Sequence, residues 1–203
     1  MSLQAIKCKL CRREGNKLFL KGERCFGVKC AFTRRSYAPG QNGKKFAGKS
    51  SDYGKQLRAK QACKRTYKIR ERVLSKYYNI AAKSKGATGE RILQILETRF
   101  DNVLYRLGMA ESRSHAQQII NHGHTLINGK KVDIPSYNLK LNDKISFDDK
   151  TKKSSKNTNN KNIIPLWMQF NKEKHEATIL RIPTKDEIQT DIDITLIVEF
   201  YSR

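Results

Sequence analysis

The most regular hydrophobic pattern in the chain lies between residues 88 and 147. From Glu90 to Leu107, apolar residues recur at intervals of three and four, the spacing that puts them on one buried face of a helix. Thr88 is a candidate cap for the start of this helix, and Gly108 is placed to end it. The predicted face consists of Ile92, Ile95, Leu96, Phe100, Val103, Leu104 and Leu107.

A second amphipathic helix is predicted after a short break. Ser112 is a candidate N-cap, and Gly123 is placed to stop the helix. Ala116, Ile119 and Ile120 fall on its inner face. Another face carries polar side chains at intervals of four, namely Arg113, Gln117 and Asn121.

After this helix the pattern becomes alternating, which predicts short strands. Leu126 and Ile127 precede Asn128 and Gly129, the pair that most favours a two-residue hairpin turn because both positions tolerate positive φ. A second reversal is predicted at Asn142-Asp143. Further strand positions are predicted at Val132, Ile134, Leu139, Leu141, Ile145 and Phe147. The whole segment predicts a compact αα-β module.

The C-terminal part begins with a polar stretch. Residues 148–162 contain no apolar side chain, so a flexible strap is expected. Trp167, flanked by Leu166 and Met168, favours packing over base stacking. Near the C-terminus, alternation predicts a half-buried strand through Ile192, Ile194, Leu196, Val198 and Phe200.

The net charge of the chain is +23, from 42 Lys and Arg against 19 Asp and Glu. Residues 1–85 hold 24 basic and 4 acidic residues, whereas residues 86–203 hold 18 and 15. A charge this large and this uneven indicates a polyanionic partner. Membrane binding is not expected, because the sequence contains neither a long apolar run nor an aromatic-rich amphipathic anchor.

Four cysteines near the N-terminus, Cys8, Cys11, Cys25 and Cys30, have the spacing C-x2-C-x13-C-x4-C. Two thiol pairs separated by a loop match a closed tetrahedral zinc site. Disulfides are not expected, because residues 1–6 are too short for a secretory signal. An iron-sulfur cluster is the rival metal centre.

A basic, glycine-rich loop follows the cysteines and includes Pro39-Gly40-Gln41-Asn42-Gly43. Small residues let backbone N–H groups approach phosphates closely. Helices with one very basic side are then predicted from about residue 55 to residue 76, because apolar residues such as Leu57 and Leu74 recur among the cations.

These elements together predict an α+β fold. It comprises a zinc-clipped N-terminal segment with its basic loop (1–45), a helical body with a C-terminal strand (46–89 and 163–203), an inserted αα-β RNA-binding module with short hairpin strands (90–148) and a polar strap (149–162).

Seven segments, in order along almost the whole chain, resemble the family of small-subunit ribosomal protein four in its zinc-bearing form. The final segment contains the terminal Phe-Tyr-Ser-Arg. Seven segments in this order are far more specific than any one of them. They are Cys8–Gly15, Leu20–Cys30, Ala38–Gly43, Ser51–Gly54, Arg99–Gly108, Asn121–Pro135 and Val198–Arg203.

This resemblance implies an architectural, non-enzymatic role in a cytoplasmic or organellar ribosome. The family binds a junction of small-subunit rRNA helices early in assembly. It lies beside ribosomal proteins three and five at the tunnel through which mRNA enters, and it is linked to decoding accuracy. The family's RNA-facing segments correspond to Arg12, Arg13, Lys21, Arg34, Arg35, Gln41, Tyr53, Arg58, Lys60, Arg113, Gln117, His122, His124, Asn128 and Lys130.

Two features depart from the family pattern. Asn42 stands where the family usually has a histidine, which removes one possible cationic contact. The polar strap stands where a charged helix usually follows the module.

Two other functions remain as alternatives. Modules of this kind also accompany pseudouridine synthases, and Arg99-Phe100-Asp101 is similar to the triplet around their catalytic aspartate. Here the triplet lies inside a predicted helix, so Asp101 is expected to be a surface or helix-pairing carboxylate. The second alternative is a zinc-containing DNA-binding regulator, which would use the same positive charge.

Overall fold

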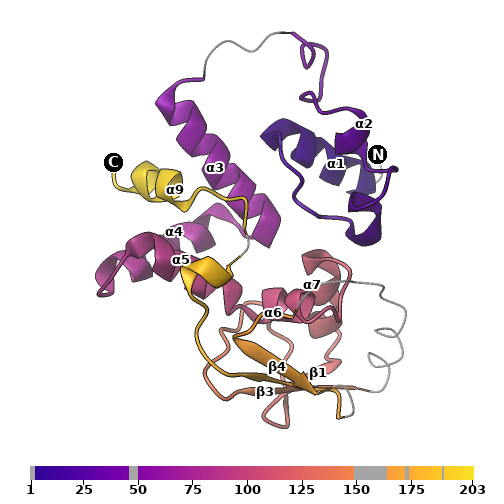
Figure 1. Ribbon diagram of the computed structural model, residues 1–203, viewed down its shortest axis with the longest axis vertical. Helices are drawn as coiled ribbons and strands as arrows, with labels where there is room; N and C mark the ends of the chain where they lie inside the picture. Colours follow the sequence, from indigo (N-terminus) through magenta and orange to yellow (C-terminus); the bar gives the residue numbers. More distant parts are fainter. Residues whose placement is uncertain (1–2, 46–49, 149–163, 172–173, 189) are drawn as a thin grey trace. The chain divides into compact units, whose positions relative to one another are not determined.

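The computed structural model describes residues 3–45, 50–148, 164–171, 174–188 and 190–203. Contacts divide the chain into two compact units (Figure 1). The terminal unit comprises Met1–Gly89 and Asp191–Arg203, and the central unit comprises Glu90–Thr190. The N- and C-terminal segments of the chain thus belong to the same unit.

The terminal unit is built from helices. They are α1 (Leu3–Glu14), the 3-10 turn η1 (Gly22–Cys25), α2 (Ala31–Arg34), α3 (Asp52–Tyr67), α4 (Glu71–Lys83) and α9 (Ile194–Tyr201). No helix in the described ranges is long and apolar enough to cross a membrane.

Helix α3 has well-defined ends and packs along α9. Its start is capped by Ser51, whose hydroxyl accepts a hydrogen bond from the Gly54 amide at 3.2 Å. Its end is marked by Lys68, which has a left-handed φ of 53°. Cys63 and Tyr67 lie on its inner face, fully or almost fully buried, so Cys63 behaves as a small core residue.

The C-terminal segment is helix α9, so the predicted half-buried strand is wrong. Asp193 caps the helix by accepting hydrogen bonds from the amides of Thr195 and Leu196 at 3.0 and 3.4 Å. Ile194 and Ile197 are buried, at a spacing of three. The same short apolar run fits both periods, and packing against α3 favours the helix.

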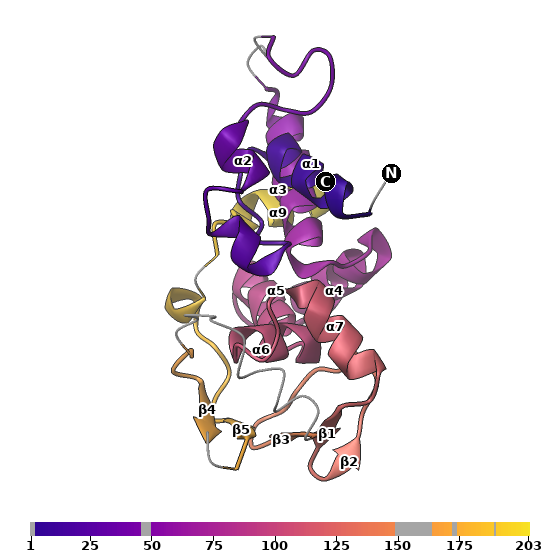
Figure 2. The ribbon, with the colours of Figure 1, turned by 90° about the vertical axis from the view of Figure 1, so that its right-hand side faces the viewer.

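The central unit places helices against one antiparallel sheet (Figure 2). The strand order is β2-β1-β3-β5-β4. The helices are α5 (Thr88–Glu97, which starts at the unit boundary), α6 (Phe100–Arg106) and α7 (Arg113–Asn121). The strands are β1 (Thr125–Ile127), β2 (Lys130–Lys131), β3 (Lys144–Phe147), β4 (Met168–Asn171) and β5 (Glu176–Ile179). The 3-10 turn η2 (Lys185–Glu187) follows the sheet.

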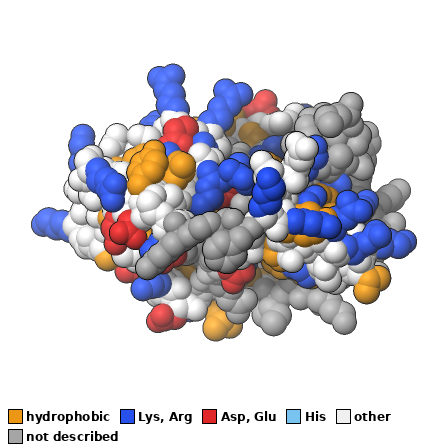
Figure 3. Space-filling model, turned by 90° about the horizontal axis from the view of Figure 1, so that it is seen from above, with side chains coloured by type: hydrophobic (Ala, Val, Ile, Leu, Met, Phe, Trp, Pro, Cys, Tyr) orange, Lys and Arg blue, Asp and Glu red, His pale blue; other side chains and the backbone are white. Residues whose placement is uncertain are grey.

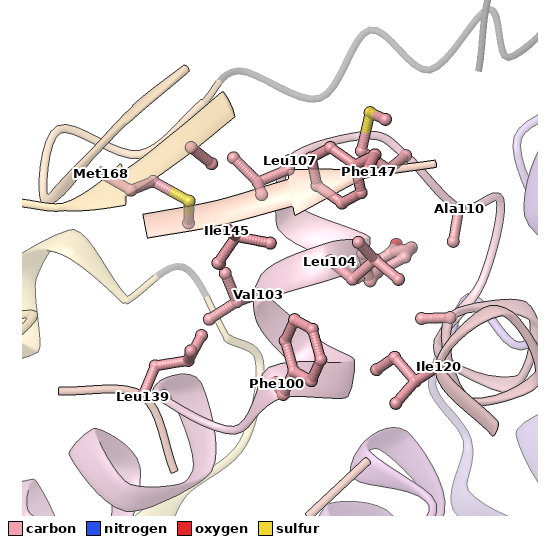
Figure 4. Close-up of a cluster of buried hydrophobic side chains, with 14 of the residues drawn as sticks. Phe100, Val103, Leu104, Leu107, Ala110, Ile120, Leu139, Ile145, Phe147 and Met168 are labelled. Carbon is pink, nitrogen blue, oxygen red and sulfur yellow. The ribbon is translucent and has the colours of Figure 1, made fainter. Parts of the chain in front are cut away.

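Between α6, α7 and the sheet lies a contiguous hydrophobic core (Figure 4). Val103 of α6 lies beside Ile145 of β3, while Leu104 lies on the side of α6 that faces Ile120, and these side chains are fully or almost fully buried. Ile120 of α7 and Met168 of β4 complete opposite sides of the cluster. Burial of this kind supplies most of the stabilisation of a small domain.

The helix predicted from residue 90 to residue 107 is in fact two helices. Arg99 is extended and forms an isolated bridge with Asn138. Next to it, the Phe100 amide donates to the Tyr137 carbonyl oxygen at 2.8 Å. These long-range backbone bonds replace helical ones, so the chain turns between α5 and α6 while keeping its apolar face.

The second helix and the hairpin are confirmed. The Ser112 hydroxyl accepts a hydrogen bond from the His115 amide at 3.3 Å, and α7 ends just before Gly123, which has a φ of +71°. Asn128 and Gly129 have φ values of 50° and 78° between β1 and β2. Two successive positive values are those of a type I′ turn.

The described residues between 164 and 190 lie in the central unit and not in the helical body (46–89 and 163–203) to which the sequence analysis assigned them. Strand β5 pairs with β3, and β4 pairs with β5. Trp167 is only 1% exposed in the same core, so its packing role is confirmed. These short strands are stable because the Ala177 and Ile179 side chains are buried on the helix-facing side.

Strand prediction was only partly right before β3. Among the described residues 132–143, none belongs to a strand, although Asn142 makes the predicted reversal with a φ of 64°. Ile145 and Phe147 lie in β3 as predicted. The polar strap, 149–162, lies outside the described residues.

Candidate RNA interface

A buried polar network joins α5 to α6. Both carboxylate oxygens of Glu97 accept hydrogen bonds from Arg106, at 3.1 and 3.0 Å. Asn102 donates to the same carboxylate at 2.8 Å and to the Glu97 carbonyl oxygen at 3.1 Å. A buried charge costs several kcal/mol unless it is fully paired, so this network constrains the corner. The Arg106 guanidinium is thereby turned toward the interior.

Asp101 is held in a second part of this network. Its carboxylate accepts two hydrogen bonds from Arg99, at 3.1 and 2.8 Å, and one from Gln117 at 2.8 Å. The side chain is 2% exposed. Asp101 is therefore a helix-pairing carboxylate with no free face for a substrate, and Gln117 points to it from α7.

Arg113 lies inside the module. Its Nε donates to Asn102 at 2.8 Å, its guanidinium stacks 4.6 Å from the centre of the Tyr105 ring, and it is 8% exposed. Arg113 and Gln117, both predicted RNA contacts, thus connect α7 to the polar network. Whether either also reaches RNA stays a prediction.

The hairpin and the end of α7 form an exposed polar edge of the central unit. His122 is exposed, and its ring lies 6.1 Å from that of His124. A Cβ on Gly123 would collide with the Lys131 side chain, so that lysine lies across the end of the helix. Lys130 is exposed on the same hairpin. Cations and imidazoles are thereby gathered where a phosphate backbone could approach.

Asn128 organises the tip of this edge. Its amide nitrogen donates to the Asp143 carboxylate at 2.8 Å, and its amide oxygen accepts from the Lys144 amide at 2.9 Å. Its side chain therefore fixes the turn that presents Lys130. This positioning role could not be read from the sequence, because Asp143 is fifteen residues away.

In the terminal unit, the four predicted metal ligands line one small pocket. Cys8 and Cys11 come from α1, Cys25 ends η1, and Cys30 immediately precedes α2. The Lys21 amide donates to the Cys25 sulfur at 3.3 Å. Within the described part of the chain, no three His, Cys, Asp or Glu side chains adopt the arrangement of a complete metal site. The spacing thus brings the thiols to a common pocket, and a metal itself stays a prediction.

The thiols do not have equivalent surroundings. Burial raises the pKa of Cys11 and of Cys25, and charge on the neighbouring cysteines raises both further. Burial also opposes ionisation of Cys30, but hydrogen bonds from Thr33 and Phe32 outweigh it and lower its pKa. A bound cation would relieve the repulsion between neighbouring thiolates that raises the pKa of Cys11 and of Cys25.

Glu14 joins the cysteine segment to α3. Its side chain is fully buried, and one oxygen accepts hydrogen bonds from Arg58, at 3.3 Å, and from Arg65. The other carboxylate oxygen has no hydrogen-bond partner among the described residues. Arg58, a predicted RNA contact, is thus engaged in holding α1 against α3, with 38% of its side chain exposed.

Arg12 shapes the basic loop. Its guanidinium donates to the carbonyl oxygens of Tyr37 and Ala38 at 2.9 and 3.3 Å and stacks 4.9 Å from the Tyr37 ring centre. Lys44 lies 5.4 Å over the same ring. The folded loop leaves other predicted contacts exposed, namely Arg13, Arg34, Arg35 and Gln41; Lys21 is partly buried.

A second ion-pair cluster joins α3, α4 and α9. The Glu71 carboxylate contacts the ammonium groups of Lys60 and Lys64 at 2.9 and 2.8 Å, and the Tyr201 hydroxyl donates to it at 2.6 Å. Lys60 also lies 3.9 Å over the Phe200 ring and is 6% exposed. Lys60 is therefore part of the helical core, and whether it also reaches RNA, as the family resemblance implies, stays a prediction.

This ion-pair cluster shifts the pKa values of two of its members, Glu71 and Tyr201. Burial alone would raise the pKa of Glu71, but hydrogen bonds from Lys64, Tyr201 and Lys60 outweigh it and lower the pKa from 4.5 to about 2. Burial and the adjacent carboxylate raise the pKa of Tyr201. Nearby, Tyr53 is half exposed, with its ring 5.8 Å from that of Phe200.

The residues that the sequence analysis missed are acidic. Only four carboxylates occur in residues 1–85, and two of them, Glu14 and Glu71, neutralise four cations. Their rarity in a basic segment is the signal that could have identified them. Even so, Lys and Arg side chains are spread over the face shown in Figure 3, and Asp and Glu side chains lie at several places between them.

Two family matches cover most of the chain. Residues 2–97 match the family described as "Ribosomal protein S4/S9 N-terminal domain", and residues 98–145 match "S4 domain". The boundary between the matches falls at the turn from α5 to α6.

Curated relatives are similar over nearly the whole length. The chain is 50% identical to "Small ribosomal subunit protein uS4" of Dictyoglomus thermophilum over 200 residues, covering 97% of this chain and 96% of the relative. It is 51% identical to "Small ribosomal subunit protein uS4A" of Clostridium botulinum over 199 residues, with the same coverage. The corresponding protein of Acetivibrio thermocellus is 48% identical over 201 residues.

Proposed function

The chain belongs to the family of small ribosomal subunit protein uS4, and on this premise we propose which surfaces and which metal it uses there. As a member, it is an RNA-binding structural constituent of the small ribosomal subunit and not an enzyme. The relatives above are bacterial, and bacterial ribosomes are cytoplasmic; an organellar ribosome stays an alternative.

The proposed role is to bind and organise a junction of small-subunit rRNA helices during assembly. The observation that carries this proposal is the charge of the terminal unit, which holds 25 Lys and Arg against 7 Asp and Glu. Three of those carboxylates, Glu14, Asp52 and Glu71, form ion pairs with cations of the unit's own helices, so the cations of the exposed basic loop are available to bind phosphates. The polar edge of the central unit offers imidazoles and lysines to a second RNA surface.

A binding experiment tests this role. The purified full-length protein should bind a folded fragment of small-subunit rRNA more tightly than duplex DNA of equal length, and its affinity should fall steeply with salt. Chemical footprinting should locate protection at a helix junction. Equal affinity for the DNA would instead favour the zinc-containing DNA-binding regulator.

We also propose where this protein lies within the small ribosomal subunit. The proposed place, which the family resemblance implies, is near the tunnel through which mRNA enters, beside ribosomal proteins three and five, with an influence on decoding accuracy. Cross-linking from single cysteines introduced at exposed positions, such as Arg34→Cys, would test these neighbours. Cross-links to rRNA without any to either protein would reject that placement.

Zinc is proposed as the metal of the cysteine segment. The donor set fits, because Cys8, Cys11, Cys25 and Cys30 line one pocket, where burial and the neighbouring cysteines raise the pKa of Cys11 and of Cys25. Four thiolates suit Zn²⁺, which would tie α1 to α2 and contribute stability to the cysteine segment. An iron-sulfur cluster is the alternative for the same ligands.

Metal analysis distinguishes these alternatives. The freshly purified protein should contain about one zinc per chain, and four thiols should become reactive only after chelation. Visible absorption with bound iron would support the cluster. Absence of both metals with four reactive thiols would reject a metal centre without affecting the assignment of rRNA binding.

A further inference from the structure

One face of helix α4 has no role in the sites described so far. A shallow groove runs along it, lined by side chains from successive turns. The cations among them are Arg72, Lys76 and Lys83, all exposed, and Ile80 between them is 44% exposed. The groove therefore has the apolar Ile80 side chain near its centre, with positively charged side chains on either side of it.

The charges on this face differ from those on α3 in how they are neutralised. On α3, Lys60 and Lys64 are paired with Glu71, the only carboxylate on α4. Across the described ranges, none of the three α4 cations forms an ion pair, a hydrogen bond or a ring contact. The positive field of this face is therefore uncompensated.

We propose that the outer face of α4 is an RNA-binding surface that grips the phosphate backbone through Arg72, Lys76 and Lys83. This inference deepens the proposed rRNA-binding function and rests on it. Three like charges held on one side of a rigid helix repel one another, and a polyanion relieves that repulsion. The helix is well anchored, because Leu74, Tyr77 and Ala81 on its opposite face are buried.

The spacing of these side chains fits a strand of phosphates. A helix rises 1.5 Å per residue, so Arg72 and Lys76 are about 6 Å apart along the axis and Lys83 is about 10 Å further. Long flexible side chains can adjust to successive or alternate phosphates over such a span. The charged side chains that line the groove are cations, which bind phosphates whatever the base, so the contact is expected to depend little on base sequence.

The test compares two triple variants of the full-length protein. In the first, Arg72→Gln, Lys76→Gln and Lys83→Gln remove three charges and retain good helix formers. In the matched control, Lys140→Gln, Lys174→Gln and Lys185→Gln remove three charges from exposed positions in the central unit. Affinity for a small-subunit rRNA fragment is measured over a range of salt concentrations, with circular dichroism to verify folding.

The α4 variant should lose about tenfold or more in affinity at moderate salt, and its salt dependence should be shallower by about two to three counterions. The control should change both values much less. Equal losses in the two variants would overturn the α4 surface, because they would show that only total charge matters. Failure of the wild-type protein to bind the rRNA would instead overturn the proposed function itself.

A single variant separates RNA from an apolar protein partner. Ile80→Gln keeps the charge and removes the exposed hydrophobic side chain, so RNA affinity should change by less than about twofold. If RNA affinity is unaffected by the triple variant while Ile80→Gln abolishes incorporation into reconstituted small subunits, the face binds a protein and the proposal is wrong.

Discussion

The terminal and central units of this chain are stabilised in different ways. The terminal unit carries a net charge of +18, and its helices are joined by the ion-pair clusters of Glu14 and Glu71. The central unit carries +5, and its helices and sheet enclose one large apolar core. A polyanion-binding surface needs many cationic side chains, whereas a large core needs many apolar ones. In this protein the two requirements are met by different units.

The strongest test of this contrast is removal of a core side chain from the central unit. Phe100→Ala should destabilise that unit by about 3 to 5 kcal/mol, because Phe100 is fully buried between α7 and the sheet. Hydrogen exchange read separately for the two units is the measurement. A loss of hydrogen-exchange protection confined to α3 and α4 would contradict the assignment of Phe100 to the core of the central unit.

The next effect is expected at the buried network of the same unit. Glu97→Ala should cost about 3 kcal/mol, because Arg106 and Asn102 would lose their shared acceptor in a buried setting. Denaturant unfolding of Glu97→Ala and of Glu97→Gln gives the comparison. Gln keeps part of the hydrogen bonding, so a loss as large as that for Ala would argue against the network.

In the terminal unit, the corresponding ion-pair cluster should respond to acid. The pKa of Glu71 is about 2 when folded and 4.5 in the reference state, so its contribution is complete above about pH 5 and is lost as the pH falls toward 2. The pKa shift of Glu71 corresponds to a contribution of about 3 kcal/mol to the free energy of unfolding. Because the side chain is partly exposed, solvent screening reduces this contribution to about 1 to 2 kcal/mol.

Acid titration with and without Glu71→Gln checks this. The variant should lose stability at pH 7 and show a flatter acid dependence between pH 5 and 2. A matched control, Glu23→Gln, changes an exposed carboxylate of the same unit and should leave the profile unaltered.

The smallest effect is expected for a single exposed cation of the central unit. Lys130→Gln should reduce the salt dependence of RNA binding by about one counterion and leave stability unchanged. The measurement is rRNA affinity over several salt concentrations. A loss of folding, or no change in slope, would remove Lys130 from the polar edge.

Local signals explain what the sequence could predict. Ser112, Gly123, Asn128 and Gly129 determine their own helix ends and turn, and these were predicted without knowledge of the fold. The break at Arg99 could not be predicted, since it depends on pairing with Asn138, thirty-nine residues away. Helix α9 was mistaken for a strand because its partner, α3, lies far away in the sequence.

The site was predicted unevenly for the same reason. Arg13 and Lys130, predicted as RNA contacts from the family resemblance, are exposed, and whether they bind RNA stays a prediction. Residue type alone could not separate these from Lys60 and Arg113, whose side chains are buried by partners far along the chain. Burial of a cation is decided by where the few carboxylates and aromatic rings lie, and that is tertiary information.

Helix α9 has a consequence for the order in which the protein can fold during synthesis. Its Phe200 and Tyr201 contact Lys60 and Glu71, and Ile194 would lie 3.2 Å from a Cβ placed on Gly89. All of the central unit is translated before these residues. Its core can therefore form before α9 is available to pack against α3 and α4. A chain that ends a dozen residues early would contain the complete central unit but a terminal unit that lacks α9.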